Sequence, residues 1–189
     1  MKEFGIFLFS TTIFVLEILK RNATSSQIKH NYEIDVTPPL PNEAVNILQI
    51  SKLCHLATCT DNEPHLALMN FTYYQLDEVI ILCTRRNTKK YFQLLNCKKV
   101  AILVHDFPHI ETDNQYNQTF SITLNGVVSL LQDTDESSIK YRKIHLMKNP
   151  KYDQFIVGDD IAVIIVKIDS ARICDIKDKV TYWNKYDSK

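Results

Sequence analysis

Glycine is scarce in this sequence. Only three glycines occur among the 189 residues, Gly5, Gly126 and Gly158. The dinucleotide fingerprint and the Walker-type phosphate loop both need clustered glycines, so the sequence excludes both motifs. A phosphate bound by this chain must therefore be held by hydroxyls, cations or helix N–H groups.

Metal-binding patterns are also missing. No C-x-x-C pair occurs, and the number of cysteines is odd, which argues against a zinc motif and a disulfide framework. We expect mostly reduced, buried thiols at Cys54, Cys59, Cys83, Cys97 and Cys174. Four histidines lie in or beside apparent strands without a fixed pair spacing, so we predict no metal site from His55, His65, His105 and His109.

Neither sign of charge is in excess. The chain has 22 Lys+Arg and 22 Asp+Glu, and 45% of its residues are hydrophobic. Zero net charge argues against a nucleic-acid partner, which usually requires a basic surface. The length and composition favour one globular domain with a tail.

The N-terminus has an apolar stretch of its own. Ile6–Leu16 is apolar, and Lys2 and Lys20-Arg21 flank it. It is too short for a standard transmembrane helix, and no small-x-small cleavage site follows it. We interpret residues 1–40 as a hydrophobic segment followed by a polar, proline-containing linker. We expect a cytoplasmic protein; a secretory signal, a weak membrane anchor, a packed helix and a dispensable extension stay open as alternatives.

Hydrophobic periodicity divides residues 41–183 into strands and inserted helices, with 184–189 as a tail. Tight polar turns join the early strands, which favours an antiparallel meander. Helices are expected over 42–51, from Asn87 or Thr88 to Asn96, and over 137–147. The expected strands are Leu53–Cys59, Pro64–Tyr74, Val79–Thr84, Val100–Val104, Phe120–Leu131 and Ile161–Ile168, the last with an extension over Ala171–Ile176. Six strands with inserted helices predict a small, mainly antiparallel barrel.

Some segments carry finer expectations. The continuous aliphatic run Val100–Val104 predicts a strand that is buried on both faces. Gly126 in a strand interior predicts a bulge or bend. A polar loop is expected over Phe107–Gln118. The apolar face of the middle helix is expected to consist of Tyr91, Leu94 and Leu95.

The zero net charge hides two opposed blocks. Residues 85–99 contain six basic and no acidic side chains, and residues 106–136 contain six acidic side chains and no Lys or Arg. Four of the cations surround a predicted helix N-terminus, where each positive charge is disfavoured by about 0.3–1 kcal/mol. They are Arg85, Arg86, Lys89 and Lys90. A bound anion such as a phosphate would compensate for them, with Thr84 and Thr88 as further donors. Surface pairs with acidic residues are the alternative.

Four segments together resemble a known family. In order and spacing they are similar to the FMN-binding split barrel of the pyridoxamine 5′-phosphate oxidase-like superfamily, over roughly residues 41–183. The likeness is greatest to small fungal members, which have no firm activity. The segments are Leu56–Cys59, Pro64–Phe71, Leu82–Lys90 and the run Asn96-x-x-x-Val100-Ala101.

The resemblance implies a six-stranded split β-barrel and a homodimer with FMN at the subunit interface. The strand residues that would lie along the flavin ring are Leu68, Met69, Asn70 and Phe71, with Cys83 and Thr84 beside it. The implied phosphate segment is Thr88, Lys89 and Lys90, and the charge pattern adds Arg85 and Arg86 to the candidate site. Ser121 would reach the ring from the partner subunit, and Trp183 would cover it near the interface.

The sequence also departs from the oxidase pattern. No arginine lies between Leu53 and Thr84, and Lys177–Trp183 lacks the substrate-binding C-terminal motif of that family. We therefore expect a flavin-dependent oxidoreductase acting on a small organic substrate, but not a vitamin B6 oxidase. A non-catalytic binder of flavin or another phosphorylated ligand, serving as sensor, carrier or interaction module, is the alternative. A third hypothesis is an inactive barrel whose basic helix meets a protein partner. No catalytic acid or base is assigned.

Overall fold

The computed structural model describes residues 39–106 and 120–187. The expectations for the N-terminal segment and for the Phe107–Gln118 loop lie outside this part. Its helices are α2 (Asn42–Ile50), α3 (Lys89–Asn96), α4 (Glu136–Lys148) and the 3-10 helix η2 (Pro150–Phe155). Its strands are β1 (Leu53–Thr60), β2 (Glu63–Tyr74), β3 (Val79–Arg85), β4 (Lys99–His105), β5 (Phe120–Leu130), β6 (Ile161–Asp175) and β7 (Val180–Asn184). No helix within these residues is long and apolar enough to cross a membrane.

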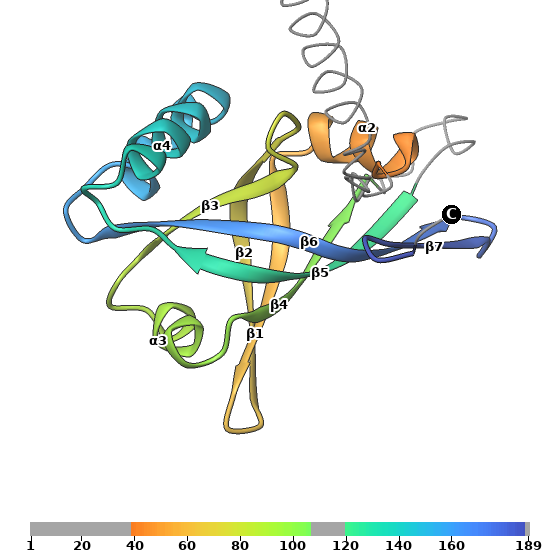
Figure 1. The fold of residues 1–189 in the computed structure, drawn as a ribbon, viewed down its shortest axis with the longest axis horizontal. Coiled ribbons are helices and arrows are strands. Elements are labelled where there is room, and N and C mark those ends of the chain that lie inside the picture. Colours follow the sequence, from red (N-terminus) through yellow and green to blue (C-terminus); the bar gives the residue numbers. More distant parts are fainter. Residues whose placement is uncertain (1–38, 107–119, 188–189) are drawn as a thin grey trace, which may run out of the picture. The chain divides into compact units, whose positions relative to one another are not determined.

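The strands form a closed antiparallel barrel, as the sequence predicts. They are ordered β3-β2-β1-β4-β5-β6-β7, and β3 also pairs with β6, which closes six of them into a ring (Figure 1). The closing register runs from Val79 opposite Lys167 to Arg85 opposite Ile161. Every strand of the ring therefore has a hydrogen-bonded neighbour on both sides.

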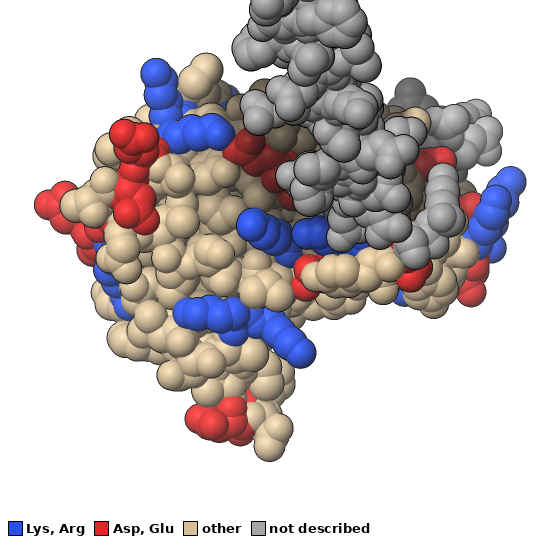
Figure 2. Space-filling model, viewed as in Figure 1, with Lys and Arg blue, Asp and Glu red and all other residues tan. Residues whose placement is uncertain are grey.

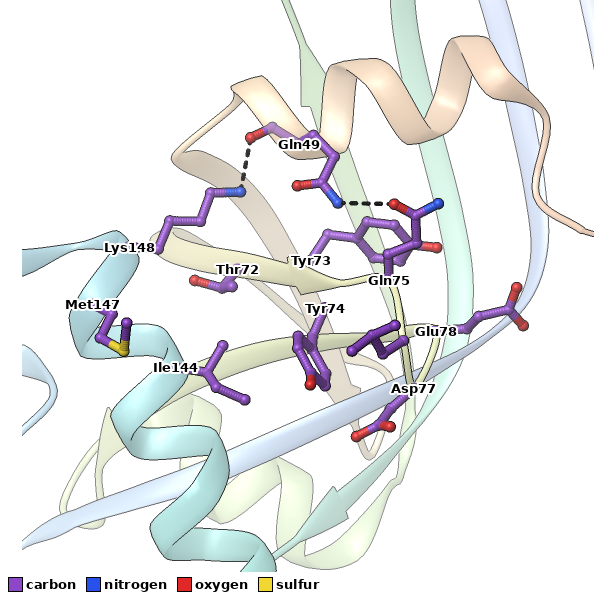
Figure 3. A pocket seen from close by; sticks show the side chains of 11 residues that line it. Gln49, Thr72, Tyr73, Tyr74, Gln75, Asp77, Glu78, Ile144, Met147 and Lys148 are labelled. Carbon is purple, nitrogen blue, oxygen red and sulfur yellow. Dashed lines mark hydrogen bonds between the residues drawn. The ribbon is translucent and has the colours of Figure 1, made fainter.

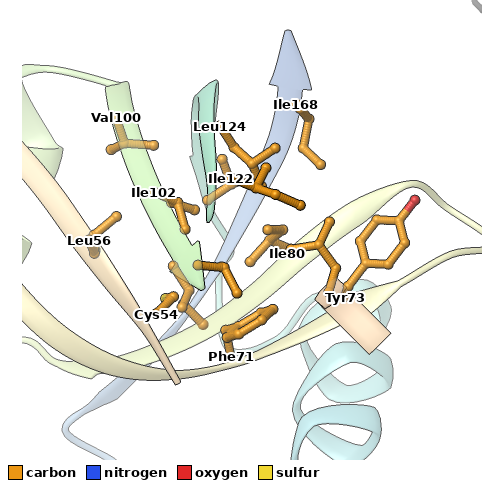
Figure 4. Close-up of a cluster of buried hydrophobic side chains, with 14 of the residues drawn as sticks. Cys54, Leu56, Phe71, Tyr73, Ile80, Val100, Ile102, Ile122, Leu124 and Ile168 are labelled. Atoms are coloured by element: carbon orange, nitrogen blue, oxygen red, sulfur yellow. The ribbon is translucent and has the colours of Figure 1, made fainter. Parts of the chain in front are cut away.

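The barrel interior is the main hydrophobic core. Alternate strand residues point inward, because successive side chains of a strand lie on opposite faces. Buried aliphatic and aromatic side chains from all six ring strands meet there (Figure 4). Fully buried examples are Leu56, Phe71, Ile80, Ile102, Ile122 and Ile164.

The outer surface of the barrel is covered on one side. Side chains of α4 and η2 pack against the outward residues of β3 and β6, which forms a second buried cluster. This cluster includes Val79, Ile81, Cys83, Val163 and Ile165.

A second region of the outer surface lacks such a cover. Outward residues of β1, β2, β4 and β5 include the exposed apolar side chains Leu66, Leu68, Leu103 and Val127. Register places Leu68 beside His55 and His55 beside Leu103. We call this region the bare face. The expectation that Val100–Val104 is buried on both faces is wrong within one chain, because β4 alternates and Leu103 is 37% exposed.

Three local details differ from the sequence expectations. β7 lies in a segment for which no strand was expected, and it extends the sheet beyond β6. The helix η2 was not predicted. On α3 the buried residues are Gln93 and Leu94, whereas Leu95 is 49% exposed. Gln93 is buried because its side chain accepts a hydrogen bond from Thr58 at 2.5 Å and donates one to the Glu63 carbonyl at 2.9 Å.

Gly126 marks a bulge, which confirms the expectation. The β5–β6 register shifts between Asn125 and Gly126. A Cβ atom at Gly126 would lie 2.3 Å from the Lys167 carbonyl oxygen and 2.9 Å from Val166 Cγ1. The glycine is therefore required by the close approach of the neighbouring strand.

Charged groups do not gather into one patch on the face in Figure 2, where separate small groups of both signs surround a largely uncharged surface.

We predict that Gly126→Ala destabilises the fold by about 1–3 kcal/mol, because the added methyl group overlaps backbone atoms of β6. Urea unfolding followed by circular dichroism measures this change. The control is Ser129→Ala, an exposed position on the same strand, with an expected change within about 0.5 kcal/mol. Equal unfolding midpoints for the two variants would contradict the prediction.

Candidate ligand-binding site

A pocket of about 250 Å³ lies where β2, β3 and the start of α3 meet α4 and η2. We call it the Lys90 pocket. Eight of its ten lining residues were predicted from the sequence: Leu68, Met69, Asn70, Cys83, Thr84, Arg85, Thr88 and Lys90. The other two are His145 and Phe155.

A tight turn places two hydroxyls at the start of α3. The strand β3 ends at Arg85, and Thr88 is the N-cap residue of α3. The Thr88 hydroxyl donates to the Arg85 carbonyl at 2.8 Å and lies 3.2 Å from the Thr84 hydroxyl. It makes no capping bond to the helix. The first-turn N–H groups of α3 thus have no side-chain cap, and such groups favour anions.

Three of the four clustered cations have carboxylate partners. Arg85 pairs with Asp160 at 2.7 Å, Arg86 with Asp133 at 2.7 Å, and Lys89 with Glu63 at 3.1 Å. Arg86 also donates to the Asp159 carbonyl at 2.9 Å. The alternative of surface pairing is therefore correct for these three side chains, and they do not require a bound anion.

Lys90 differs from its three neighbours. Its ammonium has no hydrogen-bond or ion-pair partner within residues 39–106 and 120–187, and its side chain is partly buried in the pocket wall. Burial lowers the pKa of Lys90, because desolvation disfavours the charged form. A bound anion would supply the missing counter-charge.

Apart from Arg85, which pairs with Asp160, the rest of the pocket lining is neutral. The side-chain nitrogen Nδ2 of Asn70 is buried without a partner among the described residues, so a donor faces this region unused. Burial raises the pKa of the Cys83 thiol to about 12, although the nearby Arg142 charge acts in the opposite direction. The thiol is therefore protonated at neutral pH. Leu68 and Phe155 supply apolar wall.

Six predicted site residues place their side chains elsewhere. Met69 and Phe71 point into the barrel core, so only their main chains can serve the site. The side chains of Arg86 and Lys89 turn toward their carboxylates. Ser121 lies opposite His105 on the outward side of β5, with β4 and β1 between it and β2. Trp183 lines a different hollow, together with Leu40, Tyr73, Asp77, Glu78, Lys167, Ile168 and Lys185.

His145 and Phe155 were missed by the sequence reasoning. They come from α4 and η2, which follow the pocket segment that ends at Lys90 by more than fifty residues. The residue pattern of α4 does not indicate that His145 lines a pocket. The four-residue spacing from His145 to Asn149 indicates only that these two residues share one face of the helix.

A larger and more open hollow lies between α2, the β2–β3 turn and α4 (Figure 3). Its volume is about 1020 Å³, but none of the predicted site residues lines it. Several of its polar groups already have partners. Lys148 donates to the Gln49 carbonyl at 2.8 Å, and Asp77 accepts from Lys140 at 2.6 Å and Tyr141 at 2.8 Å. The Lys90 pocket is therefore the better candidate site.

Comparisons with a family model and with a curated relative point to the same family. The family model described as pyridoxamine 5′-phosphate oxidase matches residues 40–174. A pyridoxamine 5′-phosphate oxidase homolog of Schizosaccharomyces pombe is 34% identical over 180 residues, which cover 80% of this chain and 94% of the relative.

Two solved structures share the fold. A heme binding protein from Mycobacterium smegmatis has a TM-score of 0.62 at 19% identity, covering 78% of this chain and 60% of that one. An FAD-binding protein from Mesorhizobium loti has a TM-score of 0.57 at 15% identity, covering 71% and 94%. At these identities the likeness extends to the fold alone.

We predict that Cys83 resists alkylation although it lines a pocket. With a pKa of about 12, roughly one thiol in 10⁴ is ionised at pH 8, and only the thiolate reacts. The exposed Cys59 is the internal control. Iodoacetamide labelling of the native protein, read by mass spectrometry of the peptides, is expected to modify Cys59 at least about 100-fold faster. Equal rates would contradict the assignment, and denaturant is expected to remove the difference.

Proposed function

The chain belongs to the pyridoxamine 5′-phosphate oxidase family, and we propose that it binds FMN in the Lys90 pocket. The observation that carries the proposal is the partly buried Lys90 ammonium, which has no counter-charge in the described part of the chain. It lies with two hydroxyls at the uncapped N-terminus of α3. Cation, hydroxyls and helix N–H groups together suit a phosphate.

The remainder of the pocket suits the flavin ring. Leu68 and Phe155 offer apolar contact, and Asn70 has an unused buried donor. Ring binding sites are typically apolar with a few placed polar groups. The pocket thus combines an anion-binding end with a neutral end, which matches a phosphorylated aromatic ligand.

A second copy of the chain is proposed to complete the site. Pockets for drug-sized ligands have volumes of roughly 300–1,000 Å³, whereas the pocket of one chain has about 250 Å³. Leu68 lines the pocket and is also 61% exposed on the bare face, so the two regions are continuous. A partner covering the bare face would close the pocket and bring its own Ser121 and Trp183 near the interface.

When bound, FMN would supply redox chemistry, and the residues of the chain would hold and orient it. We propose an oxidoreductase acting on a small organic substrate. The departures from the oxidase pattern are the lack of an arginine between Leu53 and Thr84 and the different residues over Lys177–Trp183, and they argue against vitamin B6 oxidation. We propose a cytoplasmic location, because all five cysteines are free thiols, as is usual in a reducing compartment.

Binding without turnover is the second candidate. At neutral pH Cys83 is protonated, so the pocket offers no thiolate, and its charged groups Lys90 and Arg85 are cations. This set favours ligand retention over proton abstraction. The test is whether candidate substrates reoxidise photoreduced flavin faster than oxygen alone does. No acceleration by any substrate class would favour a sensor or carrier.

We predict that Lys90→Gln weakens FMN binding by about 10- to 100-fold, as expected for loss of a charged hydrogen bond. The matched control is Lys89→Gln, since Lys89 already pairs with Glu63, and its expected effect is below about threefold. Flavin fluorescence titration measures both. Riboflavin, which lacks the phosphate, is expected to bind both variants equally. Purified protein that shows a heme Soret band and binds no added FMN would overturn the proposal.

We predict that Leu103→Glu on the bare face converts a dimer into a monomer and lowers FMN affinity at least about tenfold, because a carboxylate cannot be buried there unpaired. Leu76→Glu is the control, at an 82% exposed position on the β2–β3 turn, and it is expected to stay dimeric. Sedimentation velocity reports the mass of each variant. A monomeric wild type that binds FMN fully would exclude the shared site.

A further inference from the structure

His145 is a buried polar residue in the wall of the Lys90 pocket. It lies on α4, its side chain is 1% exposed, and it lines the pocket opposite the start of α3. One of its ring nitrogens, Nδ1, points toward Thr72 of β2. There it lies 2.9 Å from Thr72 Oγ1 and 3.3 Å from Asn149 Nδ2.

The surroundings of Asn149 determine which nitrogen of His145 carries the proton. Asn149 Nδ2 lies 3.2 Å from the His145 carbonyl and 3.4 Å from the Phe71 carbonyl. Because carbonyl oxygens only accept hydrogen bonds, the atom between them must be the amide nitrogen. An amide nitrogen cannot accept a hydrogen bond, so a proton on Nδ1 would find an acceptor only in the Thr72 hydroxyl. That hydroxyl lies 3.1 Å from the amide nitrogen, and we assign it as accepting one amide proton and donating its own to Nδ1.

Nδ1 is therefore an acceptor, and a neutral imidazole must then carry its proton on Nε2. Burial and the neighbouring positive charges keep the imidazole of His145 neutral. Lys148 lies on the same helix, and Lys90 and Arg85 share the pocket from α3 and β3. Burial, followed by the Lys148 charge, lowers the pKa of His145 to about 4.

We propose that His145 is a ligand-contacting residue whose Nε2–H donates a hydrogen bond to a neutral acceptor, a carbonyl oxygen or ring nitrogen, on the aromatic part of the bound ligand. Asn70, whose unused Nδ2 donor precedes Thr72 by two residues on the same side of β2, serves the same end of the pocket. The two neutral donors select the ring, and Lys90 selects the phosphate. This inference rests on the proposed FMN site for the identity of the ligand, but not for the tautomer.

The first experiment needs no ligand. Long-range ¹H–¹⁵N NMR of the wild-type protein distinguishes the two neutral tautomers and the cation. A neutral ring with the proton on Nε2 is expected from about pH 5.5 to about pH 8, because this range lies above the pKa of about 4. A proton on Nδ1, or a charged ring at pH 6, would overturn the proposal whether or not FMN binds.

The second experiment compares His145→Phe with His145→Gln by titration with FMN and with riboflavin. Phe removes the donor, whereas Gln keeps an N–H close to the position of Nε2. His145→Phe is expected to weaken both ligands equally, by about three- to tenfold, since one neutral hydrogen bond is lost. His145→Gln is expected to stay within about twofold of wild type. Circular dichroism checks that each variant is folded.

The outcomes separate the two proposals. If the wild-type protein binds neither ligand, the proposed FMN function is wrong. The NMR measurement still tests the tautomer of His145 independently. If FMN binds and His145→Phe has no effect, the His145 proposal is wrong and the FMN site remains. If His145→Phe weakens FMN but not riboflavin, His145 contacts the phosphate, which also contradicts the proposal.

Discussion

The pairing of β3 with β6 is the constraint on which the rest of the structure depends. It closes the barrel and brings Asp160, just before β6, next to the end of β3. There Arg85 pairs with the Asp160 carboxylate, and the Arg86 N–H donates to the Asp160 carbonyl at 2.8 Å. These contacts hold the turn that leads into α3. Without this closure, Thr84 and Thr88 would have no fixed place relative to Lys90, and the pocket would lose its anion-binding end.

The same closure divides the outside of the barrel into two parts. The helix α4 and η2 cover β3 and β6, whereas the bare face over β1, β2, β4 and β5 remains apolar and exposed. The Lys90 pocket lies at the boundary, which is why Leu68 belongs to both regions. This arrangement accounts for the aliphatic run of β4. Its inward residues fill the core, and its outward Leu103 belongs to the apolar surface of the bare face.

Sequence reasoning succeeded where the determinants are local. Six strands, their antiparallel order and the bulge at Gly126 follow from alternation, polar turns and one glycine. Most of the pocket lining comes from two continuous segments, Leu68–Asn70 and Cys83–Lys90, and motif order had selected both of them. The remainder depends on contacts between distant segments. Gln93 is buried only because Thr58 and Glu63 meet its amide, and His145 joins the pocket only because α4 packs across β3. No local pattern encodes these contacts.

The sequence interpretation of the four clustered cations is correct but incomplete. Four cations at a helix start do require compensation, but Asp160, Asp133 and Glu63 supply it for three of them. These pairs are exposed, so each contributes little stability, and their main effect is to hold Arg86 and Lys89 away from the pocket and to neutralise Arg85 at its edge. A single desolvated ammonium without a carboxylate partner is left at one end of the pocket, and neutral donors are left at the other. If the pocket is the proposed FMN site, it discriminates by separating charge from ring recognition, because a free anion or a free aromatic ring satisfies only half of it.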